Sequence, residues 1–149
     1  MTTRPTTDRV KESLFNIIAG YIIGADVLDL FAGTGSLGIE ALSRGANSAV
    51  FNDRSKECLT VIKENLLHTK LADKAVVFCE DATALLNRLA REGKKFHIIF
   101  LDPPYRKDLL TVTINIIAQN DILNDDGIIV AERDFADKIP EMVGDIKLA

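Results

Sequence analysis

Several features that would narrow the protein's class at once are missing from its sequence. There is no tryptophan, there are two cysteines, and no apolar run approaches the ~18 residues that mark a membrane-spanning helix. The N-terminal segment MTTRPTTDRV lacks the apolar core of a secretory signal. These absences argue against a disulfide-rich secreted scaffold and a membrane protein, so we expect a cytoplasmic protein with no membrane partner.

An excess of positive charge is also missing. The 18 basic side chains are outnumbered by 22 acidic ones, which gives a net charge of −4. The composition therefore does not indicate a broad basic surface of the kind that binds nucleic acid. What is present, 47% hydrophobic residues in a chain of 149, suffices for a sizeable core, and we expect residues 1–149 to form a single domain.

The cysteines and histidines do not suggest a metal site. Cys58 and Cys79 fall on an expected helix face and an expected strand, so we interpret them as reduced thiols of the core. His68 and His97 show no metal-ligand spacing with these cysteines. The sequence therefore predicts neither a disulfide nor a bound metal.

Short β-branched runs alternate with segments of helical periodicity. This alternation is typical of an α/β protein with a mostly parallel central sheet and helices on both faces. The tail from Glu132 to Ala149 shows only weak periodicity and is not assigned to an element. Strands are predicted at 27–31, 49–52, 75–79, 96–101 and 127–131, and helices at 7–19, 36–44 and 108–119 and around the apolar faces 58–66 and 85–89.

A glycine pattern follows the first predicted strand. Gly33, Gly35 and Gly38 form a G-x-G-x-x-G before a helix, which lets the backbone approach a nucleotide-like ligand closely. NAD, FAD and S-adenosylmethionine proteins all use such turns. Asp29 favours S-adenosylmethionine, because a carboxylate in an apolar strand is costly unless a cation such as an amino group pairs with it. The alternative is that Asp29 caps a neighbouring turn through backbone amides.

Two more carboxylates follow the next two strands. Asp53 lies 20 residues after Gly33, which is the spacing expected of an acceptor for ribose hydroxyls. Asp81 directly follows the third strand, where it can accept a hydrogen bond from the adenine amine. Each has an alternative role as a helix cap, Asp53 before the helix after Ser55 and Asp81 before the helix that begins at Ala82.

The most specific pattern is Asp102-Pro103-Pro104-Tyr105, directly after the fourth strand. Two consecutive prolines hold the backbone extended, so the Asp102 carboxylate and the Pro103 carbonyl can both accept hydrogen bonds from one exocyclic amine. Tyr105 offers a flat face for base stacking. Because the tetrapeptide follows a strand of a sheet that already carries Asp29 and the glycine pattern, we interpret it as a site for methyl transfer to an amino group and not as an ordinary Pro-Pro turn.

At these residues the chain resembles the class I S-adenosylmethionine-dependent methyltransferases. More narrowly, it resembles the bacterial family that methylates the N2 amine of one guanine in 16S ribosomal RNA. The resemblance implies a Rossmann-like fold and covers about residues 4–134. It is carried by Arg-Pro-Thr at 4–6, Asp-Arg-Val-Lys-Glu at 8–12, Leu-Phe-Asn at 14–16, the glycine region 27–45, Glu-Asn-Leu at 64–66, and 100–105.

The resemblance implies a set of site residues and a reaction. Methyl transfer would be direct and in line, and its substrate would be ribosomal RNA or a small-subunit assembly particle. The cofactor-binding residues would be Asp29, Phe31, Gly33, Thr34, Gly35, Asp53, Asp81 and Ala82, and the catalytic ones Asp102, Pro103, Pro104 and Tyr105. The basic residues placed to contact RNA phosphates, unless they are simply exposed, are Arg4, Arg9, Lys11 and Arg106.

The chain departs from the family pattern at both ends. Family members normally begin with a basic strand-forming segment and continue past the fifth strand, so we expect a sheet without its last two strands and weak RNA binding. Three alternatives stay open: another amino methyltransferase acting on adenine N6 or a glutamine amide, an NAD-binding oxidoreductase, and a non-catalytic binding module. The oxidoreductase would leave Asp29 and the Pro-Pro-Tyr motif without a role.

Overall fold

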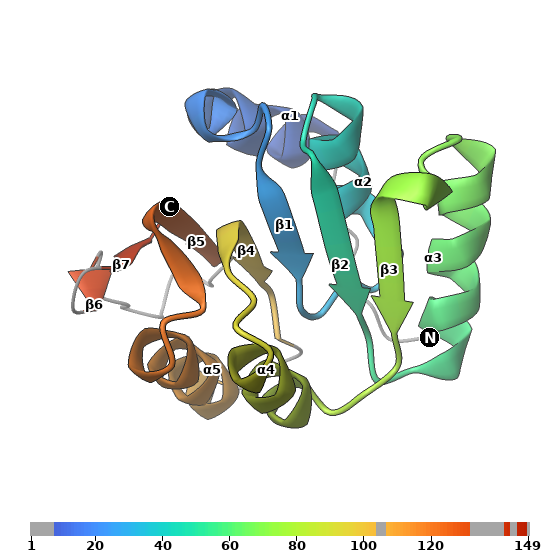
Figure 1. The fold of residues 1–149 in the computed structure, drawn as a ribbon. Coiled ribbons are helices and arrows are strands. Elements are labelled where there is room, and N and C mark those ends of the chain that lie inside the picture. The colour runs from blue at the N-terminus through green and yellow to red at the C-terminus, as the bar shows by residue number, and fades with distance from the viewer. Residues whose placement is uncertain (1–7, 104–106, 132–141, 144–145, 149) are drawn as a thin grey trace.

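The computed structural model describes residues 8–103, 107–131, 142–143 and 146–148. Its regular elements alternate between strands and helices, as the periodicity predicts (Figure 1). The parallel strands are β1 (Asp26–Asp29), β2 (Ser48–Asn52), β3 (Ala75–Phe78), β4 (Phe96–Leu101) and β5 (Leu123–Ala131). The helices are α1 (Asp8–Ile17), η1 (Ala19–Tyr21), α2 (Ser36–Ser43), α3 (Lys56–His68), η2 (Ala72–Lys74), α4 (Ala82–Arg91) and α5 (Lys107–Gln119).

The strand order β3-β2-β1-β4-β5-β7-β6 puts β1 where the order reverses. The chain runs outward from β1 to β3 and then crosses back to β4. In open sheets of this kind, ligands bind beyond the carboxyl ends of the strands at such a switch point. Asp29 at the end of β1 is in register with Phe51 of β2 and Phe100 of β4. Asp53 and Asp102 follow these partners at the same edge, on either side of Asp29.

The tail contains two short strands, β6 (Met142–Val143) and β7 (Ile146–Leu148). β7 pairs parallel with β5, and β6 pairs antiparallel with β7. The expectation of a sheet without its last two strands is therefore wrong, because the sheet has seven strands within the described residues alone. Segments of two and three residues are too short to show the alternation on which a strand prediction depends.

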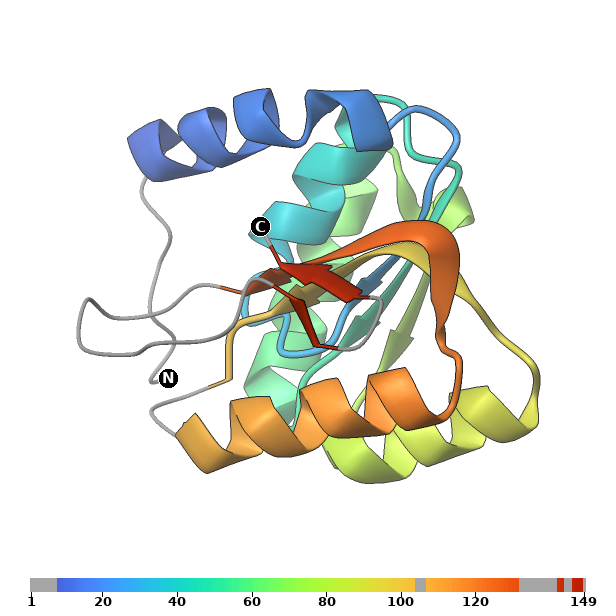
Figure 2. The same ribbon diagram turned by 90° about the vertical axis from the view of Figure 1, so that its left-hand side faces the viewer.

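Successive residues of each central strand face opposite sides of the sheet and build two separate cores. Val27 and Ile98 pack with side chains of α1, α2 and α3, whereas Leu28 and Ile99 pack with side chains of α4 and α5. Figure 2 shows these two helix layers on opposite sides of the sheet. Because both faces are covered, the strands are almost continuously apolar, as in other parallel sheets. The predicted Rossmann-like α/β fold is confirmed.

Cys58 is a buried thiol on a helix, as the sequence predicts, whereas Cys79 lies just outside the strand and the core in which the sequence placed it. Cys58 is buried in α3 and Cys79 is half-buried after β3, and neither forms a disulfide. None of the helices in the described ranges is long and apolar enough to cross a bilayer.

Helix α2 approaches β2 more closely than a side chain at Gly38 would permit. A Cβ atom added to Gly38 would lie 2.3 Å from Cε1 of Phe51, whose ring is completely buried. Atoms cannot approach this closely, and the ring has no room to move aside in a packed core. The third glycine of the pattern is therefore required by helix-to-sheet packing.

We expect Gly38→Ala to destabilise the protein by ~1–3 kcal/mol or more, because the added methyl group overpacks the core against Phe51. The midpoint and slope of urea unfolding measure this change. Gly20→Ala is the matched control, since its added Cβ meets no atom within 4 Å. Equal midpoints for the two variants would contradict the packing role of Gly38.

Candidate active site

Asp29 is a buried carboxyl group at the centre of the carboxyl edge. It is 3% exposed, and the backbone N–H of Gly38 donates a hydrogen bond of 3.1 Å to its Oδ2. Burial raises the pKa of Asp29 to about 7, and the nearby Asp102 and Asp53 carboxylates also raise it, whereas the Gly38 hydrogen bond lowers it. A cation placed here would restore the charged form, so the site suits an amino group. The amide contact matches the alternative of a backbone cap as well.

Asp53 holds the glycine loop against the end of β2. Its Oδ2 accepts a hydrogen bond of 2.9 Å from Gly33 N–H, and its Oδ1 accepts one of 2.9 Å from Ser55 N–H. Gly33 and Gly35 have φ angles of +61° and +81°, which L side chains rarely adopt. Each carboxylate oxygen can accept more than one hydrogen bond, so Asp53 keeps capacity for a hydroxyl donor.

Asn65 secures the same loop from the other side. From the last turn of α3, its Nδ2 donates a hydrogen bond of 3.0 Å to the carbonyl oxygen of Thr34. Thr34 and Phe31 are half-buried, while Gly33 and Gly35 are buried. The predictions for the site did not include Asn65. The available signal was an amide between apolar residues on one side of α3.

Asp81 is the N-cap of α4. Its Oδ2 accepts hydrogen bonds of 3.1 Å from Ala84 N–H and 2.5 Å from the Thr83 hydroxyl, and these lower the pKa of its carboxyl group. Asp81 is exposed and Ala82, the first residue of α4, is buried. The alternative role as a cap is thus present in the structure. It leaves the adenine contact as a proposal.

Asp102 and Pro103 follow β4 and are half-buried beside Asp29 at the carboxyl edge. The predicted residues Pro104, Tyr105, Arg106 and Arg4 lie outside the described residues. The structure therefore brings together Asp29, Asp53 and Asp102 as predicted. Among the described residues, no three His, Cys, Asp or Glu side chains form a group that would hold a metal ion.

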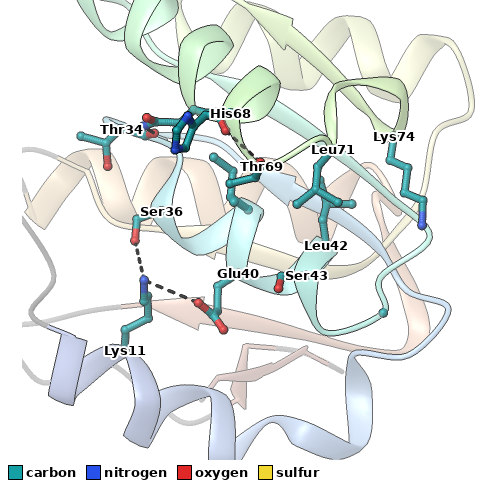
Figure 3. A pocket seen from close by; sticks show the side chains of 13 residues that line it. Lys11, Thr34, Ser36, Glu40, Leu42, Ser43, His68, Thr69, Leu71 and Lys74 are labelled. Carbon is teal, nitrogen blue, oxygen red and sulfur yellow. Dashed lines mark hydrogen bonds and ion pairs between the residues drawn. The ribbon is translucent and has the colours of Figure 1, made fainter.

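Lys11 of α1 lies beside the start of α2. Its Nζ is 3.3 Å from the Ser36 hydroxyl and 3.5 Å from Oε1 of Glu40 (Figure 3). Glu40 in turn pairs with Arg44 at 2.8 Å. Lys11 thus has an anionic partner within the protein, and Arg9 is exposed on α1.

A hollow of about 840 Å³ lies between α2 and the end of α3 (Figure 3). Its lining includes Lys11, Glu40 and Thr69, and not the carboxylates at the ends of β1, β2 and β4. Lys11 pairs with Glu40, and the Thr69 hydroxyl donates to the Asn65 carbonyl oxygen at 2.8 Å. These polar groups are occupied by contacts within the fold. The hollow borders the candidate site, because the predicted site residues Thr34 and Lys11 are part of its lining.

Residues 1–149 match the family model described as "Conserved hypothetical protein 95". The chain belongs to this family. A candidate rRNA methyltransferase of Bacillus subtilis, YlbH, is 46% identical over 97% of this chain and 78% of that protein. Ribosomal RNA small subunit methyltransferase D of Escherichia coli K12 is 39% identical over 92% of this chain and 67% of that protein.

Solved structures of the same fold also match. A conserved hypothetical protein of Streptococcus pyogenes superimposes with a TM-score of 0.83 at 33% identity, over 91% of this chain and 82% of that one. The match extends beyond the glycine loop to nearly the whole chain. The family resemblance stated for the sequence is therefore confirmed for this member of the "Conserved hypothetical protein 95" family.

The raised pKa of Asp29 predicts a pH-dependent stability. The folded carboxyl titrates at about 7, whereas an unfolded one titrates near 4. Between these values the folded state binds more protons, so Asp29 lowers the free energy of unfolding progressively as the pH rises from about 4 to about 7. The side-chain amide introduced by Asp29→Asn stays neutral throughout. The variant should therefore gain stability over wild type across this range, on the order of 2–4 kcal/mol, and then level off.

Urea unfolding at a series of pH values measures this difference. Asp73→Asn is the control, because Asp73 is exposed on η2 at the opposite edge of the sheet. Its stability relative to wild type should stay level over the same pH range. If the stability of Asp29→Asn relative to wild type also stayed constant over this pH range, the buried, protonatable state of the Asp29 carboxyl would be contradicted.

Proposed function

We propose that this protein is an S-adenosylmethionine-dependent methyltransferase that methylates the exocyclic N2 amine of a guanine in 16S ribosomal RNA. Its family membership and its similarity to ribosomal RNA small subunit methyltransferase D support the enzyme class and the ribosomal substrate. The base and the atom follow from the Asp-Pro-Pro-Tyr motif and the family resemblance. RNA in a small-subunit particle is an equally suitable form of the substrate.

The single observation that carries the proposal is the buried Asp29 carboxyl. It is 3% exposed at the switch point of the sheet, and two further carboxylates stand beside it. A site with this charge attracts the cationic amino group of S-adenosylmethionine and repels the pyrophosphate of NAD. The geometry therefore favours the methyltransferase over the oxidoreductase.

The described residues fit the parts of the cofactor. Asp29 would pair with the amino group, and the loop at Gly33 and Gly35 would lie against the methionine part through its backbone. Asp53 would accept from the ribose hydroxyls, while Asp81 and Ala82 would contact the adenine. Phe31 and Thr34 complete the loop wall. Bound S-adenosylmethionine supplies a methyl group on a sulfonium sulfur.

The chain's own contribution to catalysis is orientation and electrostatics. The Asp102 carboxylate and the Pro103 carbonyl oxygen would accept hydrogen bonds from the guanine amine and direct its nitrogen lone pair toward the methyl donor. Tyr105 would stack on the base, and Pro104 would keep the motif extended. A base paired inside RNA would first have to leave the stack. Arg4, Arg9, Lys11 and Arg106 would contact the phosphate backbone nearby.

Methyl transfer to small-subunit particles tests the function directly. With radiolabelled S-adenosylmethionine, we expect incorporation into 16S RNA, and nucleoside mass spectrometry should identify N2-methylguanosine. Asp102→Ala should lower kcat at least 100-fold, because the acceptor amine loses its orienting hydrogen bond, a loss of ~2.7 kcal/mol. Its affinity for S-adenosylhomocysteine should stay within about threefold of wild type.

The control variant is Asp73→Ala, which removes an exposed carboxylate at the opposite edge of the sheet and should keep full activity. Methylation of adenine instead of guanine would contradict the proposed base and leave the enzyme class intact. If calorimetry showed that the protein binds NADH and not S-adenosylhomocysteine, the assignment to the methyltransferases would be overturned.

The pKa of Asp29 also predicts how cofactor affinity depends on pH. The carboxyl must be ionised to pair with an amino group, and in the folded protein it titrates at about 7. The affinity for S-adenosylhomocysteine should therefore rise almost tenfold per pH unit below about 7 and level off above it. Asp29→Asn should bind weakly at every pH, with a shallower slope. Calorimetry from about pH 5.5 to 7.5 measures these affinities. If Asp29 had no part in binding, the affinity would change with pH by the same slope in wild type and in Asp29→Asn.

A further inference from the structure

Asn52, the last residue of β2, is a polar side chain in the core of the sheet. It is 1% exposed, and it makes three hydrogen bonds. Its Nδ2 donates to the carbonyl oxygens of Leu30 at 3.3 Å and Glu80 at 3.0 Å. Its Oδ1 accepts from Glu80 N–H at 3.1 Å. The sequence analysis does not predict a role for Asn52.

The Asn52 amide continues the sheet where its backbone ladder ends. The last register pair between β2 and β3 is Asn52 with Phe78. Beyond that pair, Glu80 bonds through both its N–H and its C=O to the side-chain amide of Asn52, which thus takes the place of a peptide group. On the other side, the Asn52 carbonyl oxygen accepts a hydrogen bond of 2.8 Å from Ala32 N–H. Asn52 therefore links the segments that follow the carboxyl ends of β1, β2 and β3.

Each group that the amide joins stands directly before a proposed cofactor residue. Leu30 precedes Phe31 at the glycine loop. Asn52 itself precedes Asp53, the proposed ribose acceptor, and Glu80 precedes Asp81, the proposed adenine contact. One buried side chain thus links the backbone beside these proposed contacts, in addition to the backbone hydrogen bond of 3.2 Å from Asp53 N–H to the Phe78 carbonyl oxygen.

We propose that Asn52 is a positioning residue that sets the spacing of the two loops between which the adenosine part of the cofactor binds. This inference rests on the proposed function. Asn52 acts through Asp53 and Asp81 and does not touch the methyl acceptor. It therefore controls cofactor affinity and leaves the rate of methyl transfer at saturating cofactor nearly unchanged.

Helix α4 has an anchor that does not depend on Asn52. The Glu80 carboxylate pairs with Arg88 at 2.7 Å, and the Arg88 guanidinium lies 4.7 Å from the ring centre of Phe78. Loss of the amide bonds should consequently shift the Glu80 backbone and leave α4 in place. A functional defect is then separable from unfolding.

The test substitution is Asn52→Asp, which keeps the shape of the side chain and the acceptor for Glu80 N–H. It removes both donors and places a carboxylate oxygen against two carbonyl oxygens. A second variant, Asn52→Ser, removes the amide and leaves room for water. The control is Asn120→Asp just after α5, where the exposed Asn120 side chain donates to the carbonyl oxygen of Ile116 in that helix.

Two probes separate the ends of the cofactor site. 5′-Methylthioadenosine carries the adenine and the ribose without the amino acid, and S-adenosylhomocysteine carries all three. Asn52→Asp should weaken both at least about tenfold in calorimetry, whereas Asp29→Asn should weaken mainly S-adenosylhomocysteine. In the methylation assay, KM for S-adenosylmethionine should rise by a similar factor, with kcat within about threefold of wild type.

The outcomes distinguish failure of the proposed function from failure of the positioning role of Asn52. If wild-type protein bound neither probe, the proposed function would fail. If wild type bound both and the Asn52 variants bound them equally well, the positioning role would be overturned while the function stood. A fall in kcat without a rise in KM would also overturn it. Loss of the folded state in both variants, seen by circular dichroism, would show that the fold and not the site requires Asn52.

Discussion

The hydrogen bond from Gly38 N–H to the Asp29 carboxyl is the contact on which the rest of the site depends. It forms because α2 lies close to the sheet, and α2 lies close because Gly38 has no Cβ to meet the Phe51 ring. The same hydrogen bond holds the start of α2 beside the end of β1. The glycine loop between them therefore has a defined path, and a buried carboxyl group is left at the centre of the carboxyl edge.

Around this centre, the loops are held by side-chain to backbone hydrogen bonds. Asp53 holds Gly33, Asn65 holds Thr34, and Asn52 holds Glu80. Strands of four to six residues, such as β1 and β4, bring the chain to the edge, and their ladders end at Asp29 and one residue before Asp102. Polar side chains take over at that point, since buried backbone groups beyond a ladder still need partners.

In the candidate site, a carboxylate that makes a structural contact still has acceptor capacity for the proposed ligand contact. For Asp53 and Asp81, the sequence left a ligand contact and a cap as alternatives, and the structure contains the backbone contacts of both residues. These roles do not compete, because a carboxylate has several lone pairs and a backbone amide uses one of them. A residue already oriented by the fold presents its remaining acceptor capacity in a defined direction. Such preorganisation lowers the entropy cost of binding a ligand.

Much of the fold follows from the sequence by itself. Apolar strands alternating with amphipathic helices determined the parallel sheet, and β4 has the predicted bounds of Phe96–Leu101. The glycine pattern and the aspartates after successive strands determined which edge carries the site. These signals are local, because they depend on spacing within about 20 residues.

Only the tertiary structure decided which residues hold that site together. Asn52 bonds to residues 22 and 28 positions away, and Asn65 to one 31 positions away, so no local period reveals them. The raised pKa of Asp29 likewise requires its burial and the approach of Asp102 from another strand. The short strands β6 and β7 exist through pairing with β5 and with each other. Contacts between distant segments carry these features, and the folded chain alone creates such contacts.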